Sequence, residues 1–226
     1  MSRSSSARQR GTTLVELLIV TGVLGLFLTL GVTLVTPVLN AANKLQAKAD
    51  TLQSAVTGLY RMRRDVRMSG IGGDYACTAS APVTCSQPSL LTATPAVAIL
   101  TAQSGGQPQY MTTTGNANIG LPTWQGVDVY WVASNASGTF LYEAFGAFPS
   151  GIQELPASNP VTQAQVQTAV ALALAGTSTV VAPNVSQLSA SFKPSQHVMG
   201  LKIFSSGNEG GRLNETSFES DTYARN

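Results

Sequence analysis

An apolar segment near the N-terminus limits most strongly what this chain can fold into. Residues 12–39 contain one charged side chain, Glu16, and are otherwise apolar or neutral. As a helix, these residues would extend about 42 Å, which exceeds the roughly 30 Å hydrocarbon core of a bilayer. Three arginines, Arg3, Arg8 and Arg10, precede the segment with no acid among them. The positive-inside rule therefore predicts one membrane-spanning helix with a cytoplasmic N-terminus.

The carboxylate of Glu16 is unusual in such a segment, because an acid within a spanning helix costs a few kcal/mol. A cleaved secretory signal would have a shorter apolar region and a small-x-small site after it, and neither is present. An uncleaved signal anchor explains the arginines and the apolar run but leaves Glu16 unexplained. If the chain were cut after Gly11, the new ammonium of Thr12, in the same chain or in a neighbouring copy, would be a partner for Glu16.

A basic leader, Gly11 and then "TTLVELLIV" together resemble the N-terminal signature of type IV prepilins and of the pseudopilins of type II secretion. The resemblance implies that residues 1–11 are a leader peptide and that prepilin peptidase cuts between Gly11 and Thr12. It further implies methylation of Thr12, a transmembrane and assembly helix over residues 12–39, and Glu16 as the assembly carboxylate. The first mature residue of the family is commonly Phe, whereas here it is Thr12.

A second helical pattern, over residues 40–69, continues the first. Residues at alternating steps of four and three form a mostly apolar face: Leu45, Ala49, Leu52, Val56, Leu59, Arg63 and Val66. This spacing predicts an amphipathic helix that ends before the glycines of "SGIGG", and Pro37 predicts a kink or local opening upstream. The stretch "RRDVRMSGIGG" resembles the corresponding part of PilW-type minor pilins and of the J-type pseudopilin. Its arginines could bind an acidic partner or lipid headgroups, but Asp65 among them favours a solvated helix end.

Residues 70–226, which we call the head, contain short apolar segments separated by turn residues, as in a β-rich domain. We expect strands at 127–132 and 139–145 joined by a loop of several residues, and further strands in "PAVAILTA", "STVVAPNVSQLSASF" and "LKIFSS". A proline-opened, alanine-rich stretch ending at Gly176 predicts a short helix, and residues 103–120 and 146–159 are expected to be loops. The chain is therefore expected to be α+β, with a long N-terminal helix packed on an antiparallel sheet, as in the pilin fold that the resemblance implies.

The two cysteines, Cys77 and Cys85, are separated by seven residues. With His197 as the one histidine, the chain cannot supply the four Cys or His ligands of a structural zinc site. We expect a short disulfide-closed loop, which requires an oxidising compartment, in preference to two free thiols.

Few residues of the head suggest catalysis. No G-x-S-x-G is present, and Asp128, Glu143 and Glu154 could meet in space but no spacing selects them. An oxygen-rich C-terminal segment could hold calcium, although a solvated loop leading into a final strand is favoured. Its residues are Asn208, Glu209, Asn214, Glu215, Glu219 and Asp221. After residue 11, ten bases face eleven acids, so net charge indicates no nucleic-acid partner.

The resemblance, taken with these patterns, implies a minor type IV pilin without enzymatic activity, metal or cofactor. Its partners would be prepilin peptidase, inner-membrane lipid before assembly, and other pilin or pseudopilin subunits through the N-terminal helix. It would reside in the bacterial inner membrane with a periplasmic head, and then at or near a pilus tip, where it would prime assembly. The alternatives are a J-type minor pseudopilin of type II secretion and a signal-anchored periplasmic enzyme or ligand-binding domain.

Overall fold

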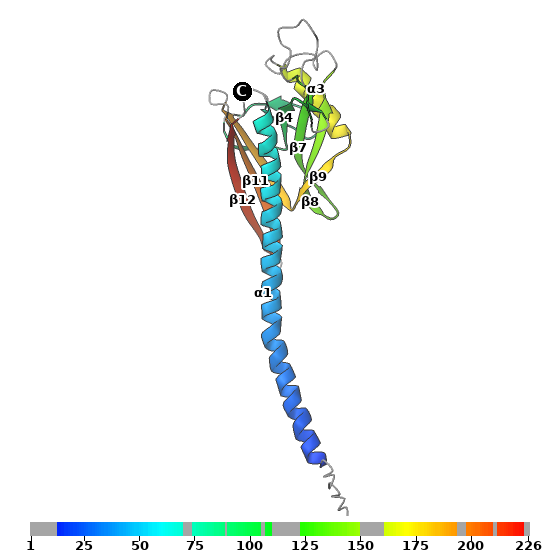
Figure 1. The fold of residues 1–226 in the computed structure, drawn as a ribbon, viewed down its shortest axis with the longest axis vertical. Helices are drawn as coiled ribbons and strands as arrows, with labels where there is room; N and C mark the ends of the chain where they lie inside the picture. The colour runs from blue at the N-terminus through cyan, green and yellow to red at the C-terminus, as the bar shows by residue number, and fades with distance from the viewer. Residues whose placement is uncertain are drawn as a thin grey trace, which may run out of the picture. The chain divides into compact units, whose positions relative to one another are not determined.

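The computed structural model describes residues 13–69, 74–88, 90–104, 107–109, 123–149, 161–193, 198–209 and 212–223. The chain divides into two compact units, residues 1–47 and residues 48–226. One helix, α1 (Leu14–Met68), contributes its N-terminal part to the first unit and its C-terminal part to the second (Figure 1). The predicted leader and cleavage site, including Gly11 and Thr12, lie outside the described residues.

The first unit is the N-terminal part of α1. Its apolar side chains are exposed, from 47% for Val23 to 80% for Leu14. By length and composition α1 is apolar enough to cross a membrane, with a mean hydropathy of 2.4 over its most apolar window. The helix assignment continues through Pro37 without a break. This part of the structure is therefore compatible with a single-pass membrane anchor.

The second unit contains two main antiparallel sheets. The six-stranded sheet has the order β2-β1-β4-β7-β8-β9, and the four-stranded sheet has the order β12-β11-β10-β3. The strands of the first sheet are β1 (Asp74–Cys77), β2 (Cys85–Ser86), β4 (Ala96–Thr101), β7 (Gly126–Asn135), β8 (Gly138–Ala147) and β9 (Thr179–Pro183). Those of the second are β3 (Thr92–Ala93), β10 (Val185–Lys193), β11 (Val198–Glu209) and β12 (Arg212–Tyr223), while β5 (Gln103–Ser104) pairs with β6 (Gln107–Pro108). The predicted α+β class with a long N-terminal helix and an antiparallel sheet is confirmed.

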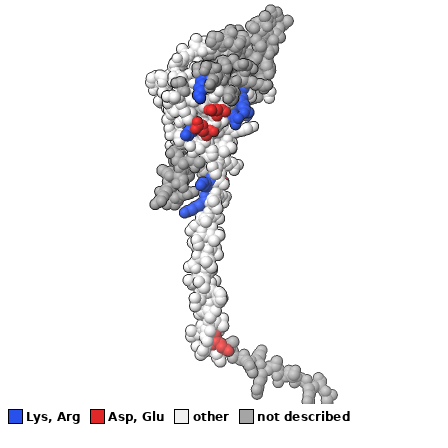
Figure 2. Space-filling view, turned by 90° about the vertical axis from the view of Figure 1, so that its left-hand side faces the viewer, with Lys and Arg blue, Asp and Glu red and all other residues white. Residues whose placement is uncertain are grey.

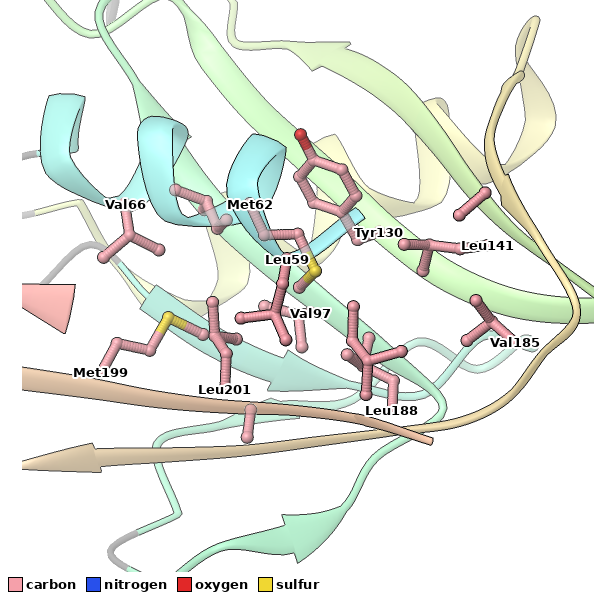
Figure 3. Close-up of a cluster of buried hydrophobic side chains, with 14 of the residues drawn as sticks. Leu59, Met62, Val66, Val97, Tyr130, Leu141, Val185, Leu188, Met199 and Leu201 are labelled. Atoms are coloured by element: carbon pink, nitrogen blue, oxygen red, sulfur yellow. The ribbon is translucent and has the colours of Figure 1, made fainter. Parts of the chain in front are cut away.

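The main core lies where the C-terminal part of α1 meets both sheets (Figure 3). Leu59, Met62 and Val66 point from the helix into a cluster that includes Leu141 of β8 and Leu201 of β11. Burying side chains of this size stabilises a fold by about 1.5–3 kcal/mol each. The helix end is thus an integral part of the second unit.

The predicted buried face of α1 was partly wrong. The residues that the helix buries are Thr51, Ala55, Gly58, Leu59, Met62, Asp65 and Val66. Two residues of the predicted stripe, Leu45 and Val56, are instead 69% and 54% exposed. The buried face combines large apolar residues with the small residues Ala55 and Gly58, which permit close packing against the sheets, and a search for large apolar side chains misses such small residues.

A larger side chain at Gly58 is expected to destabilise the second unit. A Cβ there would lie 2.9 Å from Leu141 Cδ2 and 3.4 Å from Ile203 Cδ1. Overpacking of this kind costs about 1–3 kcal/mol, so Gly58→Leu should lower the midpoint of thermal unfolding of the full-length chain in detergent, followed by near-UV circular dichroism. Gly25→Leu is the matched control, because a Cβ at Gly25 has nothing within 4 Å. Equal midpoints for the two variants would contradict the close packing.

A second, smaller core lies on the other face of the six-stranded sheet. It is formed against α3 (Gln163–Ala175), whose buried residues are Val166, Ala169, Val170 and Ala173. The helix begins with a capping box, in which Thr162 and Gln165 exchange hydrogen bonds with each other's backbone N–H, and it ends at Gly176. The predicted short helix ending at this glycine is confirmed.

Two connections differ from the sequence-based expectations. The loop of several residues between the central strands is a two-residue turn, since Asn135 of β7 pairs directly with Gly138 of β8. The φ of Gly138 is +137°, a conformation that glycine adopts without strain, and this allows the tight turn. The C-terminal segment, expected to be a loop before a final strand, is a β11–β12 hairpin paired from Val198 and Tyr223 to Glu209 and Arg212.

Candidate functional site

The N-terminal end of α1 is held by a reciprocal contact between Thr13 and Glu16. The backbone N–H of Thr13 donates to Glu16 Oε2 at 3.0 Å, and the N–H of Glu16 donates to Thr13 Oγ1 at 3.3 Å. This is a capping box, with Thr13 as the N-cap residue and Glu16 three positions later. Thr13 is the first described residue, so the structure places Glu16 at the very start of α1, next to the predicted cleavage site.

The apolar part of α1 beyond Glu16 presents almost no free polar group. The hydroxyl groups of Thr21, Thr29, Thr33 and Thr36 each donate to a backbone carbonyl three or four residues earlier, at 2.7–3.0 Å. In Figure 2 the surface of this part of the helix shows acidic atoms only near its N-terminal end. Exposed apolar surface of this extent marks an interaction site for lipid or protein. Because the threonine hydroxyls are hydrogen-bonded within the helix and the remaining surface is apolar, this part of α1 can pack against either lipid or other protein helices.

The structure contains the disulfide between Cys77 and Cys85. The two residues lie opposite each other in the β1–β2 ladder and are 2% and 3% exposed. The side-chain amide of Gln163, at the start of α3, donates to the backbone carbonyl of Cys85. The bridge therefore joins the edge of the six-stranded sheet to the core beneath α3.

Asp65 is a buried acid that the sequence analysis placed on a solvated helix end, and that interpretation is wrong. Asp65 is 5% exposed, accepts a hydrogen bond from the phenol of Tyr130, and pairs with Arg64, whose Nη2 lies 2.9 Å from Asp65 Oδ1. One turn earlier, Arg61 Nε lies 2.7 Å from Glu143 Oε2. The sequence held a signal only for the burial of Asp65, which lies seven residues after Gly58 on the face that α1 buries; it held none for the partners of Asp65 and Arg61.

The carboxyl groups near this contact have raised pKa values. Burial, and then the negative charges of Asp65 and Glu143, raise the pKa of Asp128 to about 7. Burial also raises the pKa of Glu143, although Arg61 opposes it, and burial together with Asp65 raises the pKa of the Tyr130 phenol. Asp128 and Glu143, two of the three carboxylates considered for glycoside chemistry, thus lie close enough to influence each other. Glu154 lies outside the described residues.

A further buried acid, Asp74, begins β1 and is 1% exposed. Neither of its carboxylate oxygens has a hydrogen-bond partner at good geometry, although the nearby Ser69 hydroxyl favours the charged form. Burial outweighs this effect and raises the pKa of Asp74 to about 7. The sequence analysis did not single out Asp74, because the folded sheet, and no local pattern, removes this residue from water.

The oxygen-rich C-terminal segment and His197 are only partly described. Within the described part of the chain, no three Cys, His, Asp or Glu side chains are placed to hold a metal ion. Glu219 and Asp221 lie on β12, where Glu219 Oε2 is 3.8 Å from the Nζ of Lys202. His197 and the side chains of residues 207–216 lie outside the described residues, so the structure does not test the calcium alternative at Asn208, Glu209, Asn214 and Glu215.

Comparisons with models of known protein families, with curated proteins and with solved structures found no match to this chain.

Proposed function

We propose that this chain is a minor type IV pilin, a structural subunit that enters a filament through its N-terminal helix and primes assembly at or near the tip. The observation that carries the proposal is the position of Glu16. It is the single charged side chain in an apolar helix surface, and it lies in the first turn of α1, just after a Gly11-Thr12 pair that resembles a prepilin cleavage site. A plain anchor helix would use that carboxylate only to cap its first turn, and a neutral side chain such as Gln would do the same without the cost of a charge in an apolar segment.

The mechanism begins with the leader, residues 1–11. Prepilin peptidase cuts between Gly11 and Thr12 on the cytoplasmic side, and the new amine of Thr12 is methylated. The apolar helix holds the subunit in the inner membrane, with the N-terminus cytoplasmic and the head periplasmic. The disulfide of Cys77 and Cys85 suits that oxidising compartment.

Assembly transfers the apolar surface of α1 from lipid to the helices of other subunits. During this transfer the Glu16 carboxylate neutralises the Thr12 ammonium of a neighbouring subunit, so that two charges enter apolar surroundings as a pair. In the separate chain, Glu16 instead accepts from the backbone of Thr13, and this contact keeps the carboxylate at the helix start before assembly.

A J-type minor pseudopilin of a type II secretion system would use the same processing and assembly. The "RRDVRMSGIGG" stretch resembles both kinds of subunit, and the neighbouring genes distinguish them. In either case the chain acts as a subunit, without a catalytic role.

Mass spectrometry of the mature protein from its native membrane tests the proposal most directly. The mature chain is expected to begin at Thr12, because the peptidase removes residues 1–11, and to carry a methyl group on the new amine. Gly11→Leu is the matched variant and should retain the leader. A wild-type chain that still begins at Met1 would reject the pilin function and favour a signal-anchored periplasmic enzyme or ligand-binding domain.

A further inference from the structure

The last turns of α1 form a small basic pocket that the proposed function does not use. The pocket has a volume of about 290 Å³. Among the described residues, those that line it are Tyr60, Arg63, Arg64, Arg67 and Met68 of this helix, and we call it the arginine pocket. Positions three and four apart lie on one helix face, so this spacing brings the three guanidinium groups together beside the ring of Tyr60.

Two of the three arginines in the pocket have no acidic partner among the described residues. Arg64 already pairs with Asp65, and the nearby Arg61 pairs with Glu143. Arg63 and Arg67 form no ion pair with any described residue, and Arg63 Nε is buried without a hydrogen-bond partner there. A carboxylate that entered the pocket would meet the side chains of Arg63 and Arg67, which have no acidic partner among the described residues.

The rim of the pocket is apolar and partly fixed. The Tyr60 side chain is 72% exposed. On the opposite side, the Gln103 amide donates to Met68 Sδ at 2.7 Å, which links the rim to β5. The pocket thus offers guanidinium donors next to an aromatic ring and a thioether. This combination suits a carboxylate on a short alkyl stem, since guanidinium groups bind carboxylates through paired hydrogen bonds and the stem packs on the rim.

We propose that the arginine pocket binds a glutamate or aspartate side chain from an acidic segment of a partner polypeptide. Nucleic acid fits the observations less well. The chain after residue 11 has ten bases and eleven acids, and acidic and basic groups lie side by side on the face of the head that Figure 2 shows, so the described part of this face has no extended basic surface for a phosphate backbone. A pocket of about 290 Å³ holds one side chain and not a polymer.

Fluorescence anisotropy of the full-length protein in detergent tests this site with defined probes. A fluorescein-labelled hexaglutamate peptide is expected to bind, and binding should weaken as salt rises. Hexaglutamine should not bind. Arg63→Gln/Arg67→Gln should weaken the binding of hexaglutamate about tenfold or more, because each lost guanidinium removes a charge-assisted hydrogen bond to a carboxylate.

The matched control is Lys44→Gln/Lys48→Gln, which removes two charges from the same helix outside the pocket. This variant should bind hexaglutamate as the wild type does. Three results would overturn the assignment: no binding by the wild type, equal losses in the two double variants, or tighter pocket-dependent binding of single-stranded DNA. Displacement of the peptide by inorganic phosphate at lower concentration than by acetate would also overturn it, in favour of a phosphate site.

Discussion

Glu16→Gln is expected to reduce incorporation of the chain into filaments by about 100-fold while leaving membrane insertion and leader cleavage intact. Gln at this position still completes the capping box with Thr13, so the helix start is preserved. What disappears is the negative charge. A neighbour's Thr12 ammonium would then enter apolar surroundings unpaired, at a cost of about 3 kcal/mol, which corresponds to the 100-fold loss. Immunoblots of sheared filaments, normalised to the processed chain in the membrane fraction, measure this effect.

Thr13→Ala is the matched control for the charge. It removes the capping hydroxyl, at a cost of about 1 kcal/mol to the helix start, and leaves the Glu16 carboxylate in place. Incorporation of Thr13→Ala should therefore stay within about tenfold of the wild type. If Glu16→Gln assembles as well as the wild type while Thr13→Ala does not, Glu16 acts by capping its own helix, and the charge-pairing mechanism is wrong.

Local patterns carried most of what the sequence could predict about the fold. The central hairpin of β7 and β8 and the helix ending at Gly176 each depend on neighbouring residues, namely alternating side chains, a turn and a capping sequence. The short strands β1, β2 and β3 escaped prediction because two to four residues carry no period, and their pairing partners lie elsewhere in the chain. Tertiary contacts likewise decide which face of α1 is buried. The small residues Ala55 and Gly58 let the sheets pack closely against the helix, whereas Leu45 stays exposed.

In the candidate site too, the residues of a local motif could be assigned from the sequence, whereas contacts between distant residues could not. Gly11, Thr12 and Glu16 were assigned from an ordered motif that needs no folded partner, and their roles remain predictions. The contacts of Asp65 with Tyr130 and of Arg61 with Glu143 join residues that are 65 and 82 positions apart. No local pattern encodes such distances. Arg61 and Asp65 therefore looked like part of a solvated helix end until the sheet supplied Glu143 and Tyr130 as their partners.

Asp74 is expected to make the head less stable as pH rises from about 4 to about 7. Its pKa is raised from 3.8 to about 7 in the folded chain. In this window the folded state keeps a proton that the unfolded state releases, so raising the pH favours unfolding. A difference of about 3 pKa units corresponds to about 4 kcal/mol of the free energy of unfolding, fully present below the unfolded pKa and lost as pH passes the folded pKa. Asp128 shifts in the same direction and adds to the trend.

Asp74→Asn isolates this contribution, because the amide is similar in size and does not titrate. The full-length variant in detergent should show a flatter dependence of its thermal midpoint on pH, and at pH 8 it should be more stable than the wild type. Asp50→Asn removes a carboxylate from an exposed position of α1 and should keep the wild-type slope. A wild-type chain whose midpoint rises steadily from pH 4 to pH 7, with the same slope in Asp74→Asn, would mean that water or a donor reaches Asp74. Its carboxylate would then be charged in the folded head, and burial at the start of β1 would not govern its protonation.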